Sequence, residues 1–399
     1  MFTLRRSNHM ARLAGLVLSM ASFCSLAQDG SGFKFNNLSV SPFVNLEYTY
    51  DSNVDNDKKN KLDDFILRTN PGVDISYTGN DWGLKGSGSY SYEKYQDQTR
   101  EDENSYRENL EFYRESASGW KLVLGEKYQK SSQDDSLTDG GRGLWRDRDE
   151  FALNGALSYQ FSEKTSATLS GQYSDLSYGN DSNQYMPLYG WTEWSTGLEL
   201  ARKITEKSNV LLDGSYQRYT SDGAVNNSSD STGYSLQAGF GSAATKKITY
   251  RVLTGASWFD YAGGDQVNGW IYSLDSSWII NRKVALTVAG SSNFQPSERE
   301  QNQAIQVYTL SSGLTYRPMR RLTTRFDVAY RREENQLDIS ASSDSGNTED
   351  QVAFRTRADY HLQRYVTLYG GFEYEIQTSD EELQEFDKYR ATLGVNFRY

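Results

Sequence analysis

The chain ends with Tyr389-Arg-Ala-Thr-Leu-Gly-Val-Asn-Phe-Arg-Tyr399, and this stretch decides the fold. Its odd-numbered positions are apolar or aromatic, and its even-numbered positions are small, polar or charged, without a break. Because successive side chains of a strand point to opposite faces, the pattern predicts a β-strand with one apolar and one hydrated face. A strand of a soluble sandwich alternates in the same way, but it seldom runs this long or stops on an aromatic C-terminus.

The same terminal run also resembles a known assembly signal. Thr392-x-Gly394-x-x-Phe397-x-Tyr399 is similar to the C-terminal signal of bacterial outer-membrane barrels, which the barrel assembly machinery recognises as the closing strand. The resemblance implies that Gly394, Phe397 and Tyr399 act as an assembly signal and that this machinery is a partner.

The N-terminus has the three parts of a secretory signal peptide. Three arginines, Arg5, Arg6 and Arg12, precede an apolar run from Leu13 to Leu26, and Ala27 ends a small-residue cleavage motif. We therefore predict a signal peptide over 1–27, cleavage near Ala27 and a short periplasmic lead over 28–41. The single cysteine, Cys24, lies inside the signal, so the mature chain has no thiolate for a disulfide or a metal.

Composition favours a transmembrane barrel over other classes. Loss of the three signal arginines lowers the net charge from −11 to −14, which argues against nucleic acid as a partner. The chain has 29 Tyr, 17 Phe, 8 Trp and 33 Gly, but its mean hydropathy is only −0.74. These values are too polar for a bundle of membrane helices and too aromatic for a disordered chain. They suit a barrel in which only alternate residues contact lipid.

From Ser41 onward the sequence repeats one unit, a strand with alternating faces, and the connections are alternately short and long. Short periplasmic turns and long outer loops are typical of outer-membrane barrels. We predict an all-β fold, a transmembrane antiparallel up-and-down β-barrel over 42–399, with about eighteen strands. The fourth and fifth strands, near 104–115 and 120–130, place Glu108 and Glu126 on the lipid face. A bulge or a position above the membrane would explain these two acids, and sixteen strands is the alternative.

A barrel of sixteen or eighteen strands encloses water, so its inward residues are the candidate functional surface. In the last four strands many inward positions are charged, and they give the predicted pore-lining set: Arg325, Asp327, Arg355, Arg357, Asp359, Glu373, Glu375, Arg390 and Arg398. These charges either pair across strands and stiffen the wall or form a basic strip that guides an anionic solute or polymer. The inward positions of the seventh to tenth strands are small and polar, which predicts a polarised lumen.

Other chemistry has weak support in the sequence. His361 is the one histidine of the mature chain and projects inward near a short turn, without a serine beside it on the lipid face, so we predict no catalysis. The acidic stretch from Asp51 to Asp63 lacks the residue order of a strong calcium loop, so we expect a solvated loop, no metal site and no cofactor. Aromatic residues combined with polar groups in two outer segments suggest carbohydrate contact through Trp145, Tyr185, Tyr189 and Trp191.

The whole mature chain resembles a family of outer-membrane β-barrel porins often encoded in exopolysaccharide clusters. The resemblance rests on Tyr48-Thr-Tyr-Asp-Ser-Asn-Val54, Thr69-Asn-Pro-Gly-Val73, the Tyr- and Gly-rich hairpins and the ending Asn396-Phe-Arg-Tyr399. It implies residence in the Gram-negative outer membrane, contact with lipid and lipopolysaccharide, and export of polysaccharide together with a periplasmic co-polymerase or export protein.

Three functions are therefore open. The first is export of a secreted polysaccharide, the second is passive diffusion of small solutes, and the third is a structural or adhesive barrel acting through its acidic loops.

Overall fold

The computed structural model describes residues 32–98, 102–131, 147–178, 190–221, 230–245, 247–262, 266–296, 304–335, 348–380 and 385–399. The predicted signal peptide lies outside these ranges. Within them, the regular elements are β-strands. None of these residues belongs to a helix long and apolar enough to cross a membrane.

The strands follow one another along the chain as β1 (Phe33–Phe35), β2 (Leu38–Asp51), β3 (Asp64–Thr78), β4 (Trp82–Tyr95), β5 (Glu103–Glu115), β6 (Trp120–Ser131), β7 (Arg148–Ser162), β8 (Thr165–Tyr178), β9 (Trp191–Lys203), β10 (Ser208–Ser221), β11 (Ser231–Thr245), β12 (Ile248–Tyr261), β13 (Gln266–Ile279), β14 (Val284–Pro296), β15 (Ala304–Met319), β16 (Leu322–Asn335), β17 (Thr348–Gln363), β18 (Val366–Ser379) and β19 (Phe386–Arg398).

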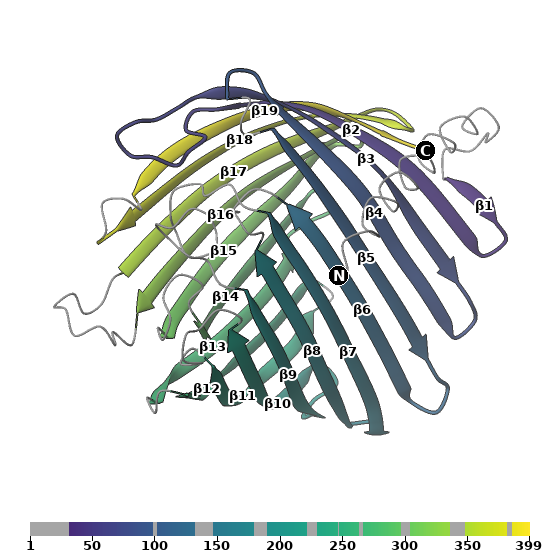
Figure 1. Ribbon diagram of the computed structural model, residues 1–399. Helices are drawn as coiled ribbons and strands as arrows, with labels where there is room; N and C mark the ends of the chain where they lie inside the picture. Colours follow the sequence, from purple (N-terminus) through teal and green to yellow (C-terminus); the bar gives the residue numbers. More distant parts are fainter. Residues whose placement is uncertain are drawn as a thin grey trace, which may run out of the picture.

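These strands form one closed antiparallel barrel (Figure 1). From β2 to β19 each strand pairs with its neighbours in the sequence, and β19 pairs with β2 to close the ring. The short β1 only extends an edge of β2, so the barrel has 18 of the 19 strands. The structure thus confirms the up-and-down barrel and the count of eighteen rather than sixteen.

The first and last strands of the barrel meet where it closes. In the register of β19 with β2, Phe397 lies opposite Val44, and the backbone N–H of Tyr399 donates to the carbonyl of Pro42 at 3.0 Å. The ring of Tyr399 also lies 5.3 Å from that of Phe33 in β1. β2 starts at Leu38 and β1 at Phe33, inside the region predicted as a lead. The start of β2 and the end of β19 lie on the side of the short turns, which is the periplasmic side of such barrels.

The outer face is apolar, as the alternation predicts. Large apolar side chains are exposed on successive strands, for example Leu198 in β9, Leu236 in β11 and Leu393 in β19, which is 71% exposed. Near the short turns, Trp82 stacks on Tyr77 with ring centroids 4.4 Å apart, and Trp120 stacks on Tyr159 at 4.2 Å. This row of exposed rings is typical of the aromatic girdle at a membrane interface.

Glu108 and Glu126 occupy the outward positions predicted from the alternation. Glu108 lies opposite Tyr128, and Glu126 lies opposite Leu110, in an unbroken register of β5 with β6. Neither a bulge in this pair nor a lower strand count therefore explains the two acids. Glu108 accepts a hydrogen bond from the hydroxyl of Tyr106 at 2.6 Å.

Candidate functional site

The inner face of the barrel carries all of the predicted pore-lining residues. The register places them on the face opposite the exposed apolar side chains: Arg325 and Asp327 in β16; Arg355, Arg357 and Asp359 in β17; Glu373 and Glu375 in β18; and Arg390 and Arg398 in β19. This common face follows from strict alternation in four consecutive paired strands.

Most of these charges are paired. In β17, Nε of Arg355 donates to Oε1 of Glu373 at 2.6 Å, and Nε of Arg357 donates to Oδ1 of Asp359 at 2.9 Å. At the periplasmic end, Nη1 of Arg398 lies 2.8 Å from Oδ2 of Asp74 in β3. The pairs of Arg355 with Glu373 and of Arg398 with Asp74 join different strands, whereas Arg357 and Asp359 pair within β17, so the wall here is a braced surface rather than a row of bare cations.

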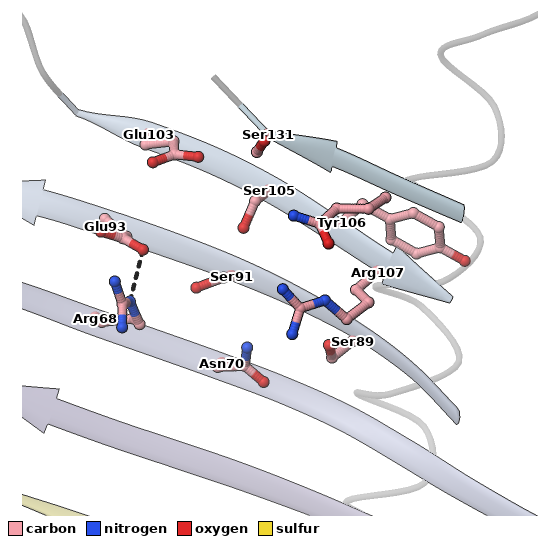
Figure 2. A pocket seen from close by; sticks show the side chains of 11 residues that line it. Arg68, Asn70, Ser89, Ser91, Glu93, Glu103, Ser105, Tyr106, Arg107 and Ser131 are labelled. Atoms are coloured by element: carbon pink, nitrogen blue, oxygen red, sulfur yellow. Dashed lines mark hydrogen bonds and ion pairs between the residues drawn. The ribbon is translucent and has the colours of Figure 1, made fainter. Parts of the chain in front are cut away.

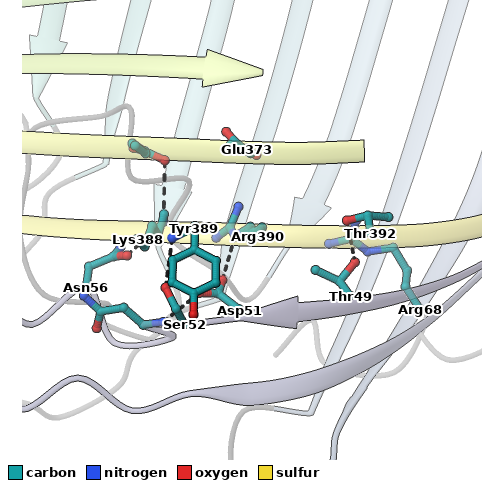
Figure 3. Close-up of polar contacts among 12 residues, drawn as sticks. Thr49, Asp51, Ser52, Asn56, Arg68, Glu373, Lys388, Tyr389, Arg390 and Thr392 are labelled. Carbon is teal, nitrogen blue, oxygen red and sulfur yellow. Dashed lines mark hydrogen bonds and ion pairs between the residues drawn. The ribbon is translucent and has the colours of Figure 1, made fainter. Parts of the chain in front are cut away.

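The closing seam contains deeply buried charges, and Figure 3 shows the contacts among them. Nε of Arg390 donates to Oδ2 of Asp51 at 2.6 Å, and the Asp51 side chain is only 2% exposed. Two residues earlier, Nζ of Lys388 donates to Oδ1 of Asn56 at 2.8 Å and lies 3.8 Å from Oε2 of Glu375. Because buried charges are costly without partners, these contacts fix the register of the first strand against the last.

Tyr369 joins the charged wall to the seam. Its ring lies beneath the guanidinium of Arg357, 4.0 Å from centroid to Cζ, and its hydroxyl donates to Oε2 of Glu47 at 3.0 Å. Space for this ring comes from Gly394, because a Cβ there would lie 2.3 Å from Cζ of Tyr369. Gly394, predicted only as part of an assembly signal, thus also has a packing role.

Beyond the seam the network continues through Arg68 in β3. Its Nη1 donates to Oε1 of Glu47 at 3.0 Å, and its Nε donates to Oε1 of Glu93 at 2.6 Å. Arg68 and Glu93 border a hollow of about 270 Å³ in the inner wall between β3 and β6 (Figure 2). The hollow is lined by polar side chains that include Asn70, Ser91 and Arg107, whereas the ring of Tyr106 points away from it.

At this hollow, Oγ of Ser91 and Oε2 of Glu93 lack a hydrogen-bond partner within the described residues, and the two residues are 7% and 5% exposed. Buried polar atoms normally have partners, so these two are available to a hydroxyl or to water. At about 30 Å³ per water molecule, the hollow has room for roughly nine waters or one sugar-sized group.

The opposite wall is largely uncharged. The inward positions of β8 to β11 are mostly hydroxyl and amide side chains: Thr168, Ser170, Gln172, Ser195, Ser215, Gln217, Ser235 and Gln237. Ser215 and Ser235 share a hydrogen bond of 2.6 Å. Three acids also occupy inward positions here, Glu193 and Glu199 in β9 and Asp213 in β10, and Arg251 of β12 pairs with Glu199. The lumen is therefore polarised, with a densely charged wall facing one of mostly hydroxyl and amide groups.

The loop after β2 packs onto the outer end of the charged wall. Val54 is buried and clusters with Ile66 of β3 and Tyr95 of β4, both on the inner face. The side-chain amide of Asn53 donates to the carbonyls of Asp57 and Asp387 at 2.9 and 3.1 Å. The expectation of a solvated loop is therefore wrong for its first residues, because an apolar anchor and a buried amide hold them.

The structure does not bring every predicted residue into this network. Arg325 lies opposite Arg357 in the register, and no ion pair joins Arg325 or Asp327 to another described residue. Of the predicted carbohydrate contacts, Trp145, Tyr185 and Tyr189 lie outside the described residues. Trp191 starts β9, with its ring 5.6 Å from that of Tyr219. Phe397, in the predicted assembly signal, is 45% exposed on the outer face.

His361 and the acidic residues show no catalytic or metal-binding arrangement. Nδ1 of His361 lies 3.0 Å from the hydroxyl of Thr367, across the β17–β18 hairpin. Across the part of the chain that the structure describes, no three His, Cys, Asp or Glu side chains are grouped to hold a metal.

The predicted pore-lining set left out the first half of the charged wall. Glu47, Asp51, Arg68 and Glu93 complete the network, and all four occupy inward positions of β2 to β4. The signal was present, because the same alternation runs through these strands.

Comparison with known proteins supports a porin-like outer-membrane barrel. Residues 202–399 match the family described as "Putative beta-barrel porin 2", which confirms the predicted resemblance to outer-membrane β-barrel porins. No curated protein matches the chain.

Several solved outer-membrane proteins are similar in fold. The copper transporter OprC is 10% identical with a TM-score of 0.49, covering 92% of this chain and 81% of that one. OpdL of Pseudomonas aeruginosa is 10% identical with a TM-score of 0.46, covering 91% and 99%. The siderophore receptor PirA of Pseudomonas aeruginosa is 8% identical with a TM-score of 0.45, covering 90% and 80%.

Proposed function

We propose that this chain, whose residues 202–399 match a family of β-barrel porins, forms a channel that exports a secreted polysaccharide across the outer membrane. Its surroundings would be outer-membrane lipid and lipopolysaccharide, its folding would depend on the barrel assembly machinery, and a periplasmic co-polymerase or export protein would deliver the polymer.

One observation carries the proposal: the hydroxyl- and amide-rich inner face of β8 to β11. Side chains such as Ser170, Gln217 and Gln237 both donate and accept hydrogen bonds, as sugar hydroxyls do. A polymer moving along this wall exchanges one hydrogen bond for another at each step, so no single position holds it tightly. The braced wall opposite keeps the passage open, and the hollow beside Ser91 and Glu93 offers further groups for hydroxyls.

A blocked-lumen variant tests the proposal. We would delete the gene and restore it either as the natural sequence or with Ser170→Trp, Ser215→Trp and Ser235→Trp. These changes place three indoles on the inner face of β8 to β11. The matched control replaces three outward residues of similar strands, with Leu169→Trp, Leu212→Trp and Leu236→Trp.

Export predicts that surface polysaccharide is lost in the deletion and in the blocked variant, and is kept in the control. Western blots and heat-modified migration would establish that all three proteins assemble. Normal surface polysaccharide in the deletion strain would exclude the export function.

A passive diffusion porin is the second candidate, because the matched family is one of porins. It predicts steady conductance for small ions in planar bilayers and no change in polysaccharide on deletion.

A further inference from the structure

The two ends of the barrel differ in charge. On the periplasmic side, the ends and turns of three hairpins carry Lys203, Lys207, Lys283, Arg317, Arg320 and Arg321, which we call the basic collar. The turn between β15 and β16 alone reads Arg317-Pro-Met-Arg-Arg321. One acid, Glu206, lies in these three turns. The turns between β11 and β12 and between β17 and β18 add Lys247 and Arg364, whereas the turn between β7 and β8 holds both Glu163 and Lys164.

The collar has no anionic partner in the part of the protein that the structure describes. All six side chains are exposed, and no ion pair joins any of them to a described acid. Nζ of Lys283 instead donates to the carbonyl of Pro318 at 3.1 Å, which holds this cation beside the arginine-rich turn. Crowding of like charges is unfavourable by itself, so an anion that binds here relieves repulsion as well as making contacts.

At the outer end, acids and cations pair with one another. Arg331 pairs with Glu333, Lys127 with Glu150 and Lys61 with Asp387. The exposed cations of the collar lack such partners among the described residues, so the two mouths differ in how far their positive charge is compensated. A polyanion is therefore attracted more strongly at the periplasmic mouth.

The collar continues into the lumen. The carbonyl of Arg321 accepts a hydrogen bond from the backbone N–H of His361, so the two residues lie opposite each other. His361 occupies an inward position of β17, which places Arg321 on the inner face as well. Arg325 follows four residues later on the same face, opposite Arg357. Lipid headgroups reach only the outer surface of the barrel. The inward cations Arg321 and Arg325 therefore favour a ligand that moves along the channel over an anionic lipid.

We propose that the cargo is a polyanionic polysaccharide and that the basic collar captures it from the periplasm. The inference rests on the proposed export function and adds the chemical class of the cargo and the direction of its passage. Carboxylate or phosphate groups spaced along the polymer contact the collar, pass Arg321 and Arg325, and leave through the outer mouth.

Polymer blocking of single channels tests this inference. The purified protein would be inserted in a planar bilayer, with its orientation assigned by streptavidin binding to a biotin on Asn60→Cys in the outer loop. Polygalacturonate oligomers and neutral dextran oligomers of equal length would be added to one side at a time. We compare the natural sequence with Arg317→Gln/Arg320→Gln/Arg321→Gln and with a matched control, Lys58→Gln/Lys59→Gln/Lys61→Gln, which removes three cations from the outer rim.

In the natural sequence, polygalacturonate should block about tenfold more often from the periplasmic side than from the outer side, within the usual range of electrostatic steering. The collar variant should lose most of this difference, the outer control should keep it, and raised salt should reduce it. Dextran should block from both sides at similar rates in all three proteins.

Other outcomes overturn the inference in distinguishable ways. Equal blocking by dextran and polygalacturonate, unchanged in the collar variant, removes the polyanion and leaves polymer export standing. Failure of both polymers to block removes export and the inference together. A collar variant that blocks normally but loses stabilisation by phosphatidylglycerol vesicles assigns the cations to lipid and also overturns the inference.

Discussion

Arg390 and Asp51 are 339 residues apart in the sequence and join the last strand of the barrel to the first through a hydrogen bond of 2.6 Å. Asp51 is almost fully buried, whereas one third of the Arg390 side chain is exposed. The pair lies at the outer end of the seam, where β19 and β2 share fewer paired residues than β2 and β3 do. It therefore acts as a polar latch at the point where the barrel closes.

Removal of one partner of this latch should destabilise the barrel. Arg390→Gln leaves a buried carboxylate without its cation, and we expect a loss of about 2–3 kcal/mol, below the 3–5 kcal/mol of a fully buried pair because Arg390 is partly exposed. The double variant Asp51→Asn/Arg390→Gln should lose less than Arg390→Gln alone. Thermal loss of heat-modified migration in detergent measures this, with Arg325→Gln as the control. Equal losses of stability in the single and double variants would contradict this role of the Arg390–Asp51 pair.

Gly394 should resist substitution for a steric reason. Gly394→Ala places a methyl group 2.3 Å from the ring of Tyr369, so the ring must move and lose its contacts with Arg357 and Glu47. Overpacking of this kind costs about 1–3 kcal/mol. Gly88→Ala is the matched control, because nothing lies within 4 Å of a Cβ there.

The test of Gly394 is the assembled fraction in outer-membrane preparations. Gly394→Ala should lower it, Gly88→Ala should not, and Tyr369→Ser should partly restore assembly of Gly394→Ala by making room. If Tyr369→Ser gives no recovery, the role of Gly394 is in recognition by the assembly machinery rather than in packing.

How much the sequence predicts depends on the range of the interaction. Alternation and turn length are local, so the strands, their faces and even the outward position of Glu126 follow from the sequence. The partner of Arg390 does not, because it depends on a register that is set only when β19 meets β2. Likewise, nothing local indicates that Val54, between polar neighbours, packs against Ile66 and Tyr95.

Release of the loop after β2 should change conductance at the outer mouth. Val54→Asp places a charge among Ile66 and Tyr95, and a buried unpaired charge is strongly unfavourable, so the loop should detach from the inner face. We expect larger current fluctuations and a higher mean single-channel conductance in planar bilayers. Leu62→Asp, on the same loop but 40% exposed, should leave the current unchanged. The same current in both variants would show that the Val54 anchor does not shape the mouth.

Glu126 supplies a test of what surrounds the outer face. It lies between Leu110 and Leu153 in the register, six residues from Trp120 in the girdle, at the height of the apolar band. If lipid surrounds it, Glu126→Leu should stabilise the barrel in vesicles by about 1 kcal/mol, since acids on a lipid face cost less than the 2–4 kcal/mol of Arg or Lys. Glu108→Leu should gain less, because it also removes the hydrogen bond from Tyr106. Leu124→Glu on the same strand should destabilise the barrel. A loss of stability in Glu126→Leu, together with a change in oligomeric size, would instead mean that a protein surface covers this acid in the membrane.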